Sequence, residues 1–198
     1  MIASLEDMQG VLLGNPSTLQ ASYDIARLVI ERNVPGDFVE CGVFAGAQSA
    51  AMAKAIECLG PIACDRHVHL FDSFEGGPAP GLEDEHFNLH HKAGFSACSL
   101  DQVTEYMRIW RVPHELLVYH PGWFEDTMPS FESPIAVLRI DCDLYASTQT
   151  VMRYLYPLVS PGGCWVICDD YNLPGCRKAI NEYFAPEGAP GPIYWIKQ

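Results

Sequence analysis

The sequence predicts an α/β protein built on a doubly wound, mostly parallel β-sheet with helices on both faces. Short apolar runs alternate along the chain with helix-length segments, a pattern typical of β-α-β units with right-handed crossovers. One run, I-A-V-L-R-I at 135–140, is apolar almost throughout, as expected of a strand covered on both faces. The chain has 198 residues, of which 48% are hydrophobic and 19% charged. We therefore expect residues 1–198 to form a single domain with a sizeable core.

The predicted elements follow one another in chain order. Ser17 is a predicted N-cap for a helix through Arg32, whose apolar residues recur at three- and four-residue spacing, so that residues 1–34 form an N-terminal helical segment. The predicted strands cover 38–41, 67–71, 115–119, 135–140, 164–168 and 193–197. The predicted helices between them cover 48–59, 100–110, 147–158 and 175–184, and two of them end at glycine and proline.

Residues 75–95 break this alternation. The segment is rich in glycine, proline and acidic residues, and we expect a lid or insertion outside the sheet. It also contains His86, His90 and His91, and side chains four residues apart share one face of a helix, as metal ligands would. In so polar a segment, solvated side chains are the favoured interpretation of these histidines.

Composition excludes several classes of partner. The formal net charge of -13 argues against nucleic acid and anionic membranes, and is compatible with a cationic ligand or a metal ion. No apolar run approaches the roughly 18 residues that span a bilayer, and the N-terminus lacks the pattern of a signal peptide, so we expect a cytoplasmic protein. The eight cysteines include no C-x-x-C pair, which favours reduced thiols over a structural zinc site.

The loop after the first strand is a candidate cofactor site. Glu40, Gly42 and Gly46 form an acid-x-Gly-x-x-x-Gly pattern, the looser pattern found where class I methyltransferases hold S-adenosylmethionine (SAM). A dinucleotide fingerprint would instead require G-x-G-x-x-G. The glycines allow close approach of a ligand to the backbone, and the next helix offers its N-terminus. Val43 and Ser49 are further candidate contacts; an ordinary β-α turn is the alternative.

The ends of the second and third strands add to this site. Asp72 can accept hydrogen bonds from vicinal ribose hydroxyls, which suits an adenosine ligand, and Ser73 follows it. Gly122 and Trp123 are candidate cofactor contacts after the third strand. Trp123 and Phe124 can face an adenine ring, although core packing is the favoured interpretation of Phe124.

Two further strands end in aspartates. Asp141 follows the fourth strand, and Asp169 and Asp170 follow the fifth. In open α/β sheets the ligand crevice lies beyond the carboxyl ends of the strands. Because carboxylate oxygens are hard ligands, these three residues predict a site for Mg²⁺ or another hard divalent cation. Capping of a turn or helix is the alternative for Asp169 and Asp170.

Asp143 is the predicted general base. If the chain remains extended beyond the fourth strand, Asp141 and Asp143 point to the same side. Asp141 is expected to hold the metal and to contact the cofactor, which leaves Asp143 to take a proton from a hydroxyl. Capping of the next helix is the alternative for Asp143. In that case the base is Asp141 itself, a histidine such as His86 or His90, or water.

Seven stretches together resemble the macrocin O-methyltransferase family, whose members methylate sugar hydroxyls on antibiotics. The match runs in register from about Val34 to Phe184. The matching stretches are G-D-F-V-E-C-G-V at 36–43, F-D-S-F-E-G at 71–76, G-W-F-E-D-T-M-P at 122–129, R-I-D-C-D-L-Y-A-S-T at 139–148, P-G-G at 161–163, D-D-Y at 169–171 and G-C-R-K-A-I at 175–180.

The resemblance implies a Rossmann-like class I methyltransferase fold, bound SAM and Mg²⁺, and methyl transfer to a hydroxyl of a small molecule such as a sugar or another natural-product acceptor. It implies that Asp141, Asp169 and Asp170 hold the metal and that Glu40, Gly42 and Asp72 contact SAM.

The termini depart from the family pattern. Family members carry extra N-terminal helices and a fuller C-terminal hairpin, and the hairpin is expected to be shortened here. We therefore expect the 75–95 segment, a partner subunit in a homodimer, or both to close the acceptor site.

Three other classes remain open. A catechol-type O-methyltransferase usually carries lysine where Leu144 stands. An N-methyltransferase would need an Asn/Asp-Pro-Pro-Tyr loop, whereas Asp169-Asp170-Tyr171 lacks both prolines. A non-catalytic SAM- or nucleotide-binding protein would share the cofactor loop but would not turn over any acceptor.

Overall fold

The strands form one sheet in the order β3-β2-β1-β4-β5-β6, as seen in a computed structural model that describes residues 16–63, 65–84, 92–162, 165–184 and 194–196. The first five strands are parallel, and β6 is antiparallel to β5. This architecture confirms the predicted α/β class with a mostly parallel sheet. The strands are β1 (Asp37–Cys41), β2 (Val68–Asp72), β3 (Leu117–Pro121), β4 (Ile135–Ile140), β5 (Trp165–Cys168) and β6 (Tyr194–Ile196).

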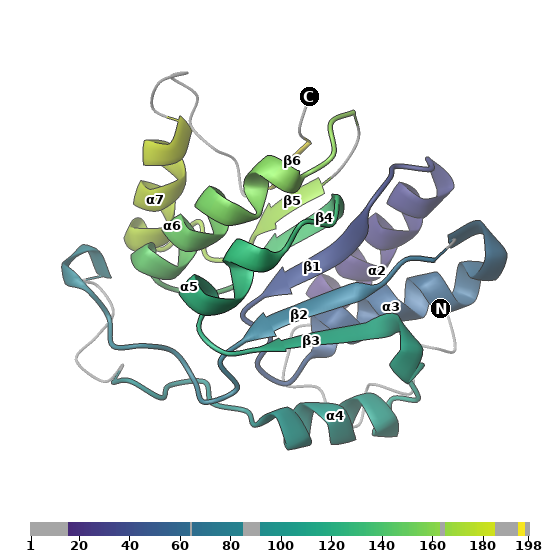
Figure 1. Cartoon of the computed structure of the whole chain (residues 1–198), viewed down its shortest axis with the longest axis horizontal. Coiled ribbons are helices and arrows are strands. Elements are labelled where there is room, and N and C mark those ends of the chain that lie inside the picture. The colour runs from purple at the N-terminus through teal and green to yellow at the C-terminus, as the bar shows by residue number, and fades with distance from the viewer. Residues whose placement is uncertain (1–15, 64, 85–91, 163–164, 185–193, 197–198) are drawn as a thin grey trace.

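Helices cover both faces of the sheet, with α5, α6 and α7 on one side and α2, α3 and α4 on the other (Figure 1). The helices are α2 (Pro16–Glu31), α3 (Ala47–Leu59), α4 (Leu100–Ile109), α5 (Phe124–Thr127), α6 (Tyr145–Tyr154) and α7 (Pro174–Phe184). In the described part of the chain, none of them is both long and apolar enough to cross a bilayer.

Two predicted elements begin two residues away from their expected start, and one short helix was not predicted. The third strand, predicted at 115–119, spans Leu117–Pro121 because His114–Leu116 form a short 3₁₀ helix before it. Helix α6 was predicted from residue 147 but begins at Tyr145, and α5 was not predicted at all. With only four residues, α5 is too short for a hydrophobic period to reveal it.

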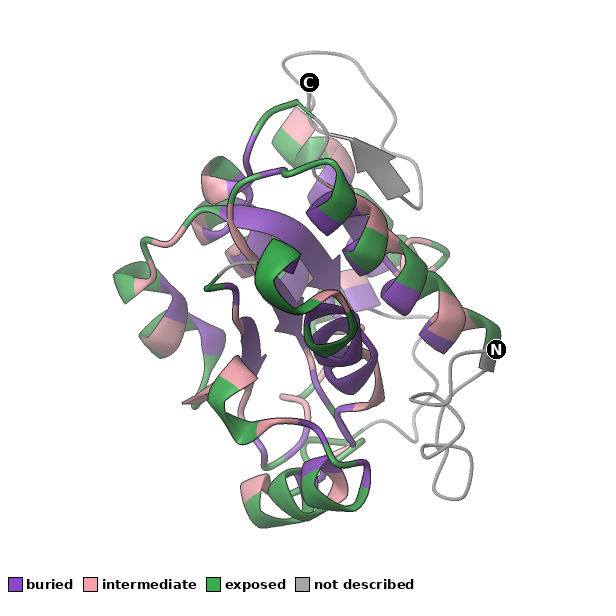
Figure 2. Cartoon of the chain, turned by 90° about the vertical axis from the view of Figure 1, so that its right-hand side faces the viewer, coloured by how far each residue is buried: buried purple, intermediate pink, exposed green. Residues whose placement is uncertain are grey.

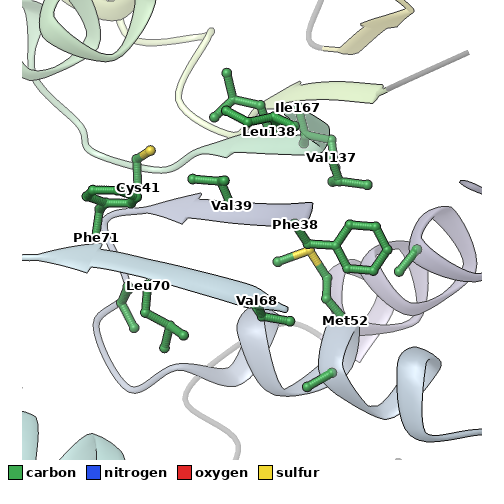
Figure 3. Packing of buried hydrophobic residues seen from close by; sticks show 14 of the residues in the cluster. Phe38, Val39, Cys41, Met52, Val68, Leu70, Phe71, Val137, Leu138 and Ile167 are labelled. Carbon is green, nitrogen blue, oxygen red and sulfur yellow. The ribbon is translucent and has the colours of Figure 1, made fainter. Parts of the chain in front are cut away.

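The core lies on both faces of the sheet, and the alternation of side chains along each strand divides it (Figure 3). Phe38 of β1 and Val68 of β2 point toward Met52 of α3, while Val39 of β1 and Leu138 of β4 point to the opposite face. Figure 2 shows the buried strands at the centre and the exposed outer faces of the helices around them. The whole of β4 is buried, as its apolar sequence predicted.

The strand register brings the predicted site residues to one edge of the sheet. Cys41 of β1 pairs with Phe71 of β2 and with Ile140 of β4, and Ile140 pairs with Cys168 of β5. Four neighbouring strands therefore end at the same level. The loops that begin at Gly42, Asp72, Asp141 and Asp169 consequently lie side by side.

Candidate active site

A cavity of about 620 Å³ opens at this edge of the sheet. Nine of the predicted site residues line it: Glu40, Gly42, Val43, Asp72, Ser73, Gly122, Trp123, Asp141 and Asp143. Four others are not among its described lining residues: Gly46, Ser49, Asp169 and Asp170. The structure thus brings the predicted cofactor loop and the predicted base to one cavity, whereas only Asp141 of the three predicted metal ligands lines it.

The two glycines of the β1–α3 loop both have a positive φ, and packing against backbone requires the first of them. Gly42 has a φ of 85°, and a Cβ at this position would overlap the backbone carbonyl of Asp141. Gly46 has a φ of 82°, and a Cβ there would collide with Met107 of α4. Both angles lie in the left-handed region that glycine tolerates best. Gly42 therefore allows the loops after β1 and β4 to touch, and Gly46 allows α4 to pack on the start of α3.

Asp72 holds the cofactor loop in place. Its Oδ2 atom accepts hydrogen bonds from the backbone N–H groups of Val43 at 2.6 Å and Phe44 at 3.3 Å. Its Oδ1 atom accepts one from Phe74 N–H at 2.8 Å. Because an ionised carboxylate has about four acceptor positions, one remains for a ligand hydroxyl. Ser73 is engaged locally, since its hydroxyl donates to the Gly76 carbonyl at 2.8 Å.

The aromatic residues near the cavity differ in exposure. Trp123 lines the cavity and is 42% exposed, whereas Phe124 is buried, as favoured from the sequence, although it also contributes to the wall. Phe44 lines the cavity as well, is 40% exposed and has a φ of 46°. Phe44 was not among the predicted site residues. An aromatic residue between two loop glycines was the pattern that could have revealed it.

Glu40 is buried beneath the cofactor loop. It accepts a hydrogen bond from Ser49 N–H at 2.9 Å and another from the Ser49 hydroxyl. Its Oε1 atom lies 3.6 Å from Nε of Arg139. Burial raises the pKa of Glu40 to about 8, against the opposing effects of Arg139 and Ser49. Ser49 therefore positions Glu40 instead of lining the cavity itself.

Arg139 is a buried counter-ion for the acidic cluster. It is 3% exposed, forms an ion pair with Asp169, and places Nη2 3.5 Å from Asp141 Oδ2. Its Nη1 atom also donates to the hydroxyl of Ser22 on α2 at 3.2 Å. The protein thus supplies part of the positive charge that we expected a metal ion to bring.

The backbone beyond β4 is not extended, so the geometry assumed for Asp143 was wrong. The strand ends at Ile140, and Asp143 has a left-handed φ of 62°. Asp143 nevertheless reaches the cavity through this turn. Its backbone N–H donates to Asp170 Oδ2 at 3.0 Å, which holds the turn against the end of β5.

The carboxylates of Asp141, Asp169 and Asp170 are suitable ligands for a hard divalent cation, but their side chains are not arranged as a preformed metal site. Burial, followed by repulsion from Asp143 and Asp141, raises the pKa of Asp170 to about 7, and the opposing effect of Arg139 is the smallest of the causes. Yet no three histidine, cysteine or acidic side chains of the described residues are grouped to hold a metal ion. The metal site therefore stays a prediction. His86, His90 and His91 lie outside the described residues.

The described parts of the 75–95 segment form one wall of the cavity. They contribute Gly76, Gly77, Pro78, Ala79, Gly81, Asp84 and Phe95. Asp84 is 2% exposed and accepts hydrogen bonds from Tyr145 N–H at 2.9 Å and from Gly81 N–H at 3.0 Å. Asp84 was not among the predicted site residues, because its contact with a residue 61 positions later leaves no local pattern.

Comparison with known proteins identifies relatives along most of the chain. A tetracenomycin-C derivative 4'-O-methyltransferase of Streptomyces olivaceus is 38% identical over 170 residues, which cover 83% of this chain and 64% of that protein. Demethyldecarbamoylnovobiocin O-methyltransferase of Streptomyces niveus is 40% identical over 163 residues, which cover 79% of this chain and 61% of that protein. The chain thus spans about three fifths of the length of these curated relatives.

A solved structure and a family model agree with these matches. The structure of the O-methyltransferase NovP superposes with a TM-score of 0.82 at 35% identity, over 91% of this chain and 79% of that one. It shares the class I, Rossmann-like architecture predicted for this sequence. The family model for macrocin O-methyltransferase matches residues 13–198. The chain therefore belongs to the macrocin O-methyltransferase family.

Proposed function

We propose that this protein is a SAM-dependent O-methyltransferase that acts on a hydroxyl of a natural-product glycoside. The observation that carries the proposal is that the Glu40–Gly46 loop, Asp72 and Asp143 meet in one cavity at the carboxyl ends of the strands. Family membership supports the reaction class. Among the relatives, the names of the two curated enzymes describe methylation of natural products, and one of those products carries a rhamnosyl group.

SAM would lie over the loop after β1. Asp72 has one acceptor position left for a ribose hydroxyl, and Trp123, next to the Gly122 whose N–H donates to the Asp72 carbonyl, offers an exposed aromatic face for adenine. Gly42 and Val43 present backbone to the ligand. The sulfonium of SAM carries a positive charge, which suits a wall that includes the carboxyl groups of Asp141 and Asp143.

The acceptor would be uncharged or cationic. The described lining residues include no lysine, arginine or histidine. They include six acidic residues: Glu40, Asp72, Asp84, Glu125, Asp141 and Asp143. A phosphorylated acceptor would therefore meet repulsion without a cationic partner. The aromatic side chains of Phe44, Phe95 and Trp123 offer apolar contact area for the ring of a neutral glycoside.

Asp143 would act as the general base. Methyl transfer is an in-line displacement in which the acceptor oxygen bonds to the methyl carbon as the carbon–sulfur bond breaks, leaving S-adenosylhomocysteine (SAH). The hydroxyl proton passes to the Asp143 carboxylate. Because the loops after β1, β2 and β4 all face this cavity, they can hold donor and acceptor in reacting order, which contributes several kcal/mol.

Mg²⁺ dependence is part of the proposal. Asp141, Asp169 and Asp170 would hold the ion, and the setting of Asp170 supports this, because burial and then repulsion from Asp143 and Asp141 raise its pKa to about 7. The ion pair between Asp169 and Arg139 argues against this metal site, because it already occupies the carboxylate of Asp169. A bound ion would lower the pKa of an acceptor hydroxyl and orient it.

The test is direct. Calorimetry with SAM and SAH should give binding in the micromolar range, and SAH formation should be detected with a panel of neutral glycosides, simple diols and catechols. Binding without turnover of any acceptor would favour the non-catalytic alternative. Preferred turnover of catechols would favour the catechol class, and absence of SAM binding would overturn the proposal. Light scattering on the same sample would test the expected homodimer.

A further inference from the structure

We propose that Asp84 is a positioning residue that fixes residues 75–84 as the acceptor-side wall of the cavity. The proposal rests on the proposed function, which makes the side of the cavity next to Asp143 the acceptor side. Asp84 belongs to a short 3₁₀ helix, Leu82–Asp84, in the segment that leaves the sheet after β2. Its buried carboxylate connects this segment to two helices from the other half of the chain.

The first connection is to α6. No side-chain hydrogen bond from its own N-cap, Leu144, caps this helix. Asp84 supplies the missing acceptor, because Oδ1 accepts from the N–H of Tyr145, the first helical residue, at 2.9 Å. A negative charge at this end also interacts favourably with the helix dipole. Since Tyr145 lies two residues after Asp143, this bond ties the wall to the turn that carries the proposed base.

The second connection is to α7. Gly175 lies in the first turn of this helix and is buried. A Cβ on Gly175 would overlap Asp84 Oδ1 and would come within 3.4 Å of the Glu83 carbonyl oxygen. The absence of a side chain at Gly175 therefore lets the carboxylate of Asp84 pack between the first turns of α6 and α7. At the rim, Lys178 of α7 lies 3.6 Å from Glu83.

The segment is also folded around the same carboxylate. Asp84 Oδ2 accepts from Gly81 N–H at 3.0 Å, and both Gly81 and Asp84 line the cavity. Loss of this buried carboxylate would leave two backbone donors, those of the exposed Gly81 and the half-buried Tyr145, without their acceptor. The cofactor loop, by contrast, is held by Asp72 and Glu40. Asp84 should therefore govern acceptor binding and not SAM binding.

Four variants test this role: Asp84→Ala, Gly175→Ala, the double variant, and Glu75→Ala as a control at an exposed acid of the same segment. By hydrogen exchange, Asp84→Ala and Gly175→Ala should each speed exchange across 76–84 and at the start of α6 by about tenfold or more. In the double variant the methyl group introduced at position 175 would enter the space vacated by the Asp84 carboxylate. The increases in exchange rate caused by Asp84→Ala and by Gly175→Ala should therefore not add in the double variant. Glu75→Ala should exchange like wild type.

The binding and kinetic readouts separate positioning from general loss of structure. The Kd for SAH should stay within about twofold in all four variants, whereas the KM for the best neutral glycoside of the panel should rise about tenfold or more in Asp84→Ala, with kcat within about threefold. Unchanged exchange across 76–84, additive effects in the double variant, or a parallel fall in SAH affinity would overturn the proposal. Failure of wild type to bind SAH would sink the proposed function alone, because the exchange readout needs no ligand.

Discussion

Asp72 Oδ2 accepts a hydrogen bond at 2.6 Å from the backbone N–H of Val43, so the end of β2 holds the loop that follows β1. The same oxygen accepts from Phe44 N–H at 3.3 Å, which helps to keep Phe44 at its left-handed φ of 46°. The residue predicted to bind the ribose thus also shapes the loop on which the cofactor would rest. Ligand contact and loop geometry are coupled in one side chain.

Replacing Asp72 should therefore weaken cofactor binding. We expect Asp72→Ala to raise the Kd for SAM and SAH by about tenfold or more, because both the ribose acceptor and the anchor of the loop are lost. Calorimetry measures this directly. Asp65→Ala, at an exposed acid before β2 that does not line the cavity, should bind SAM like wild type. An unaltered Kd in Asp72→Ala would remove Asp72 from the site.

Asp143 should be required for turnover. Asp143→Asn keeps the size of the side chain, and asparagine tolerates the left-handed backbone at this position, but the variant loses basicity. We expect kcat to fall by about a hundredfold or more with the Kd for SAH unchanged. Steady-state assays of SAH formation measure this. Near-normal turnover would leave Asp143 with a structural role and return the base to one of the alternatives.

Divalent metal should be required for turnover but not for SAM binding. We expect a chelator to abolish SAH formation and added Mg²⁺ to restore it, because Asp141, Asp169 and Asp170 supply hard oxygen ligands. Asp170→Asn should weaken the response to Mg²⁺, whereas Glu75→Ala should leave it intact. Full activity in the presence of chelator would rule out a role for a divalent ion in turnover.

The contact between Gly42 and Asp141 should be essential for stability. Gly42→Ala would force a Cβ against the Asp141 carbonyl at a left-handed φ, and we expect the free energy of unfolding to fall by about 2 kcal/mol or more. Gly162→Ala is the matched control, because Gly162 has the same φ of 85° and nothing lies within 4 Å of the position that a Cβ would take there. The Gly162→Ala variant should lower the free energy of unfolding by only about 1 kcal/mol. Equal losses by urea unfolding would mean that backbone strain alone explains the effect.

His120 should make the protein less stable at acid pH. Its Nε2 atom lies 2.9 Å from Nδ1 of His69, and its ring stacks on Phe71 at a centroid distance of 4.0 Å. Burial, and secondly His69, lowers the pKa of His120 to about 4 from an ordinary value of 6.5. Between those values the unfolded chain binds the proton and the folded chain does not. The contribution of neutral His120 to the free energy of unfolding is therefore complete above about pH 6.5 and is lost as the pH falls toward about 4.

The variant His120→Gln isolates this contribution. Urea unfolding between about pH 7 and pH 4 should show a shallower decline of the free energy of unfolding in the variant than in wild type, because one linked proton is removed. Other groups titrate in the same range, so the difference between the two curves is the measured quantity. Parallel curves would mean that His120 does not carry the linkage.

Local sequence was sufficient for most of the fold and for the position of the site. The apolar run at Ile135–Ile140 predicted a strand buried on both faces, and β4 is buried throughout. Acids at strand ends, such as Asp72 and Asp141, predicted which edge of the sheet would carry the site, because parallel strands end together. These features are encoded within a few residues, where side-chain periodicity and turn chemistry act.

Only the tertiary structure decided how the acidic residues are paired. No local pattern could have revealed that Arg139 reaches Asp169 and Glu40, or that Asp84 caps α6 across 61 residues. Asp143 was expected on an extended chain, yet its left-handed turn is held by Asp170 from a neighbouring strand. Charge pairing depends on which groups share a buried space, and that is set by the packing of distant segments and not by spacing along the chain.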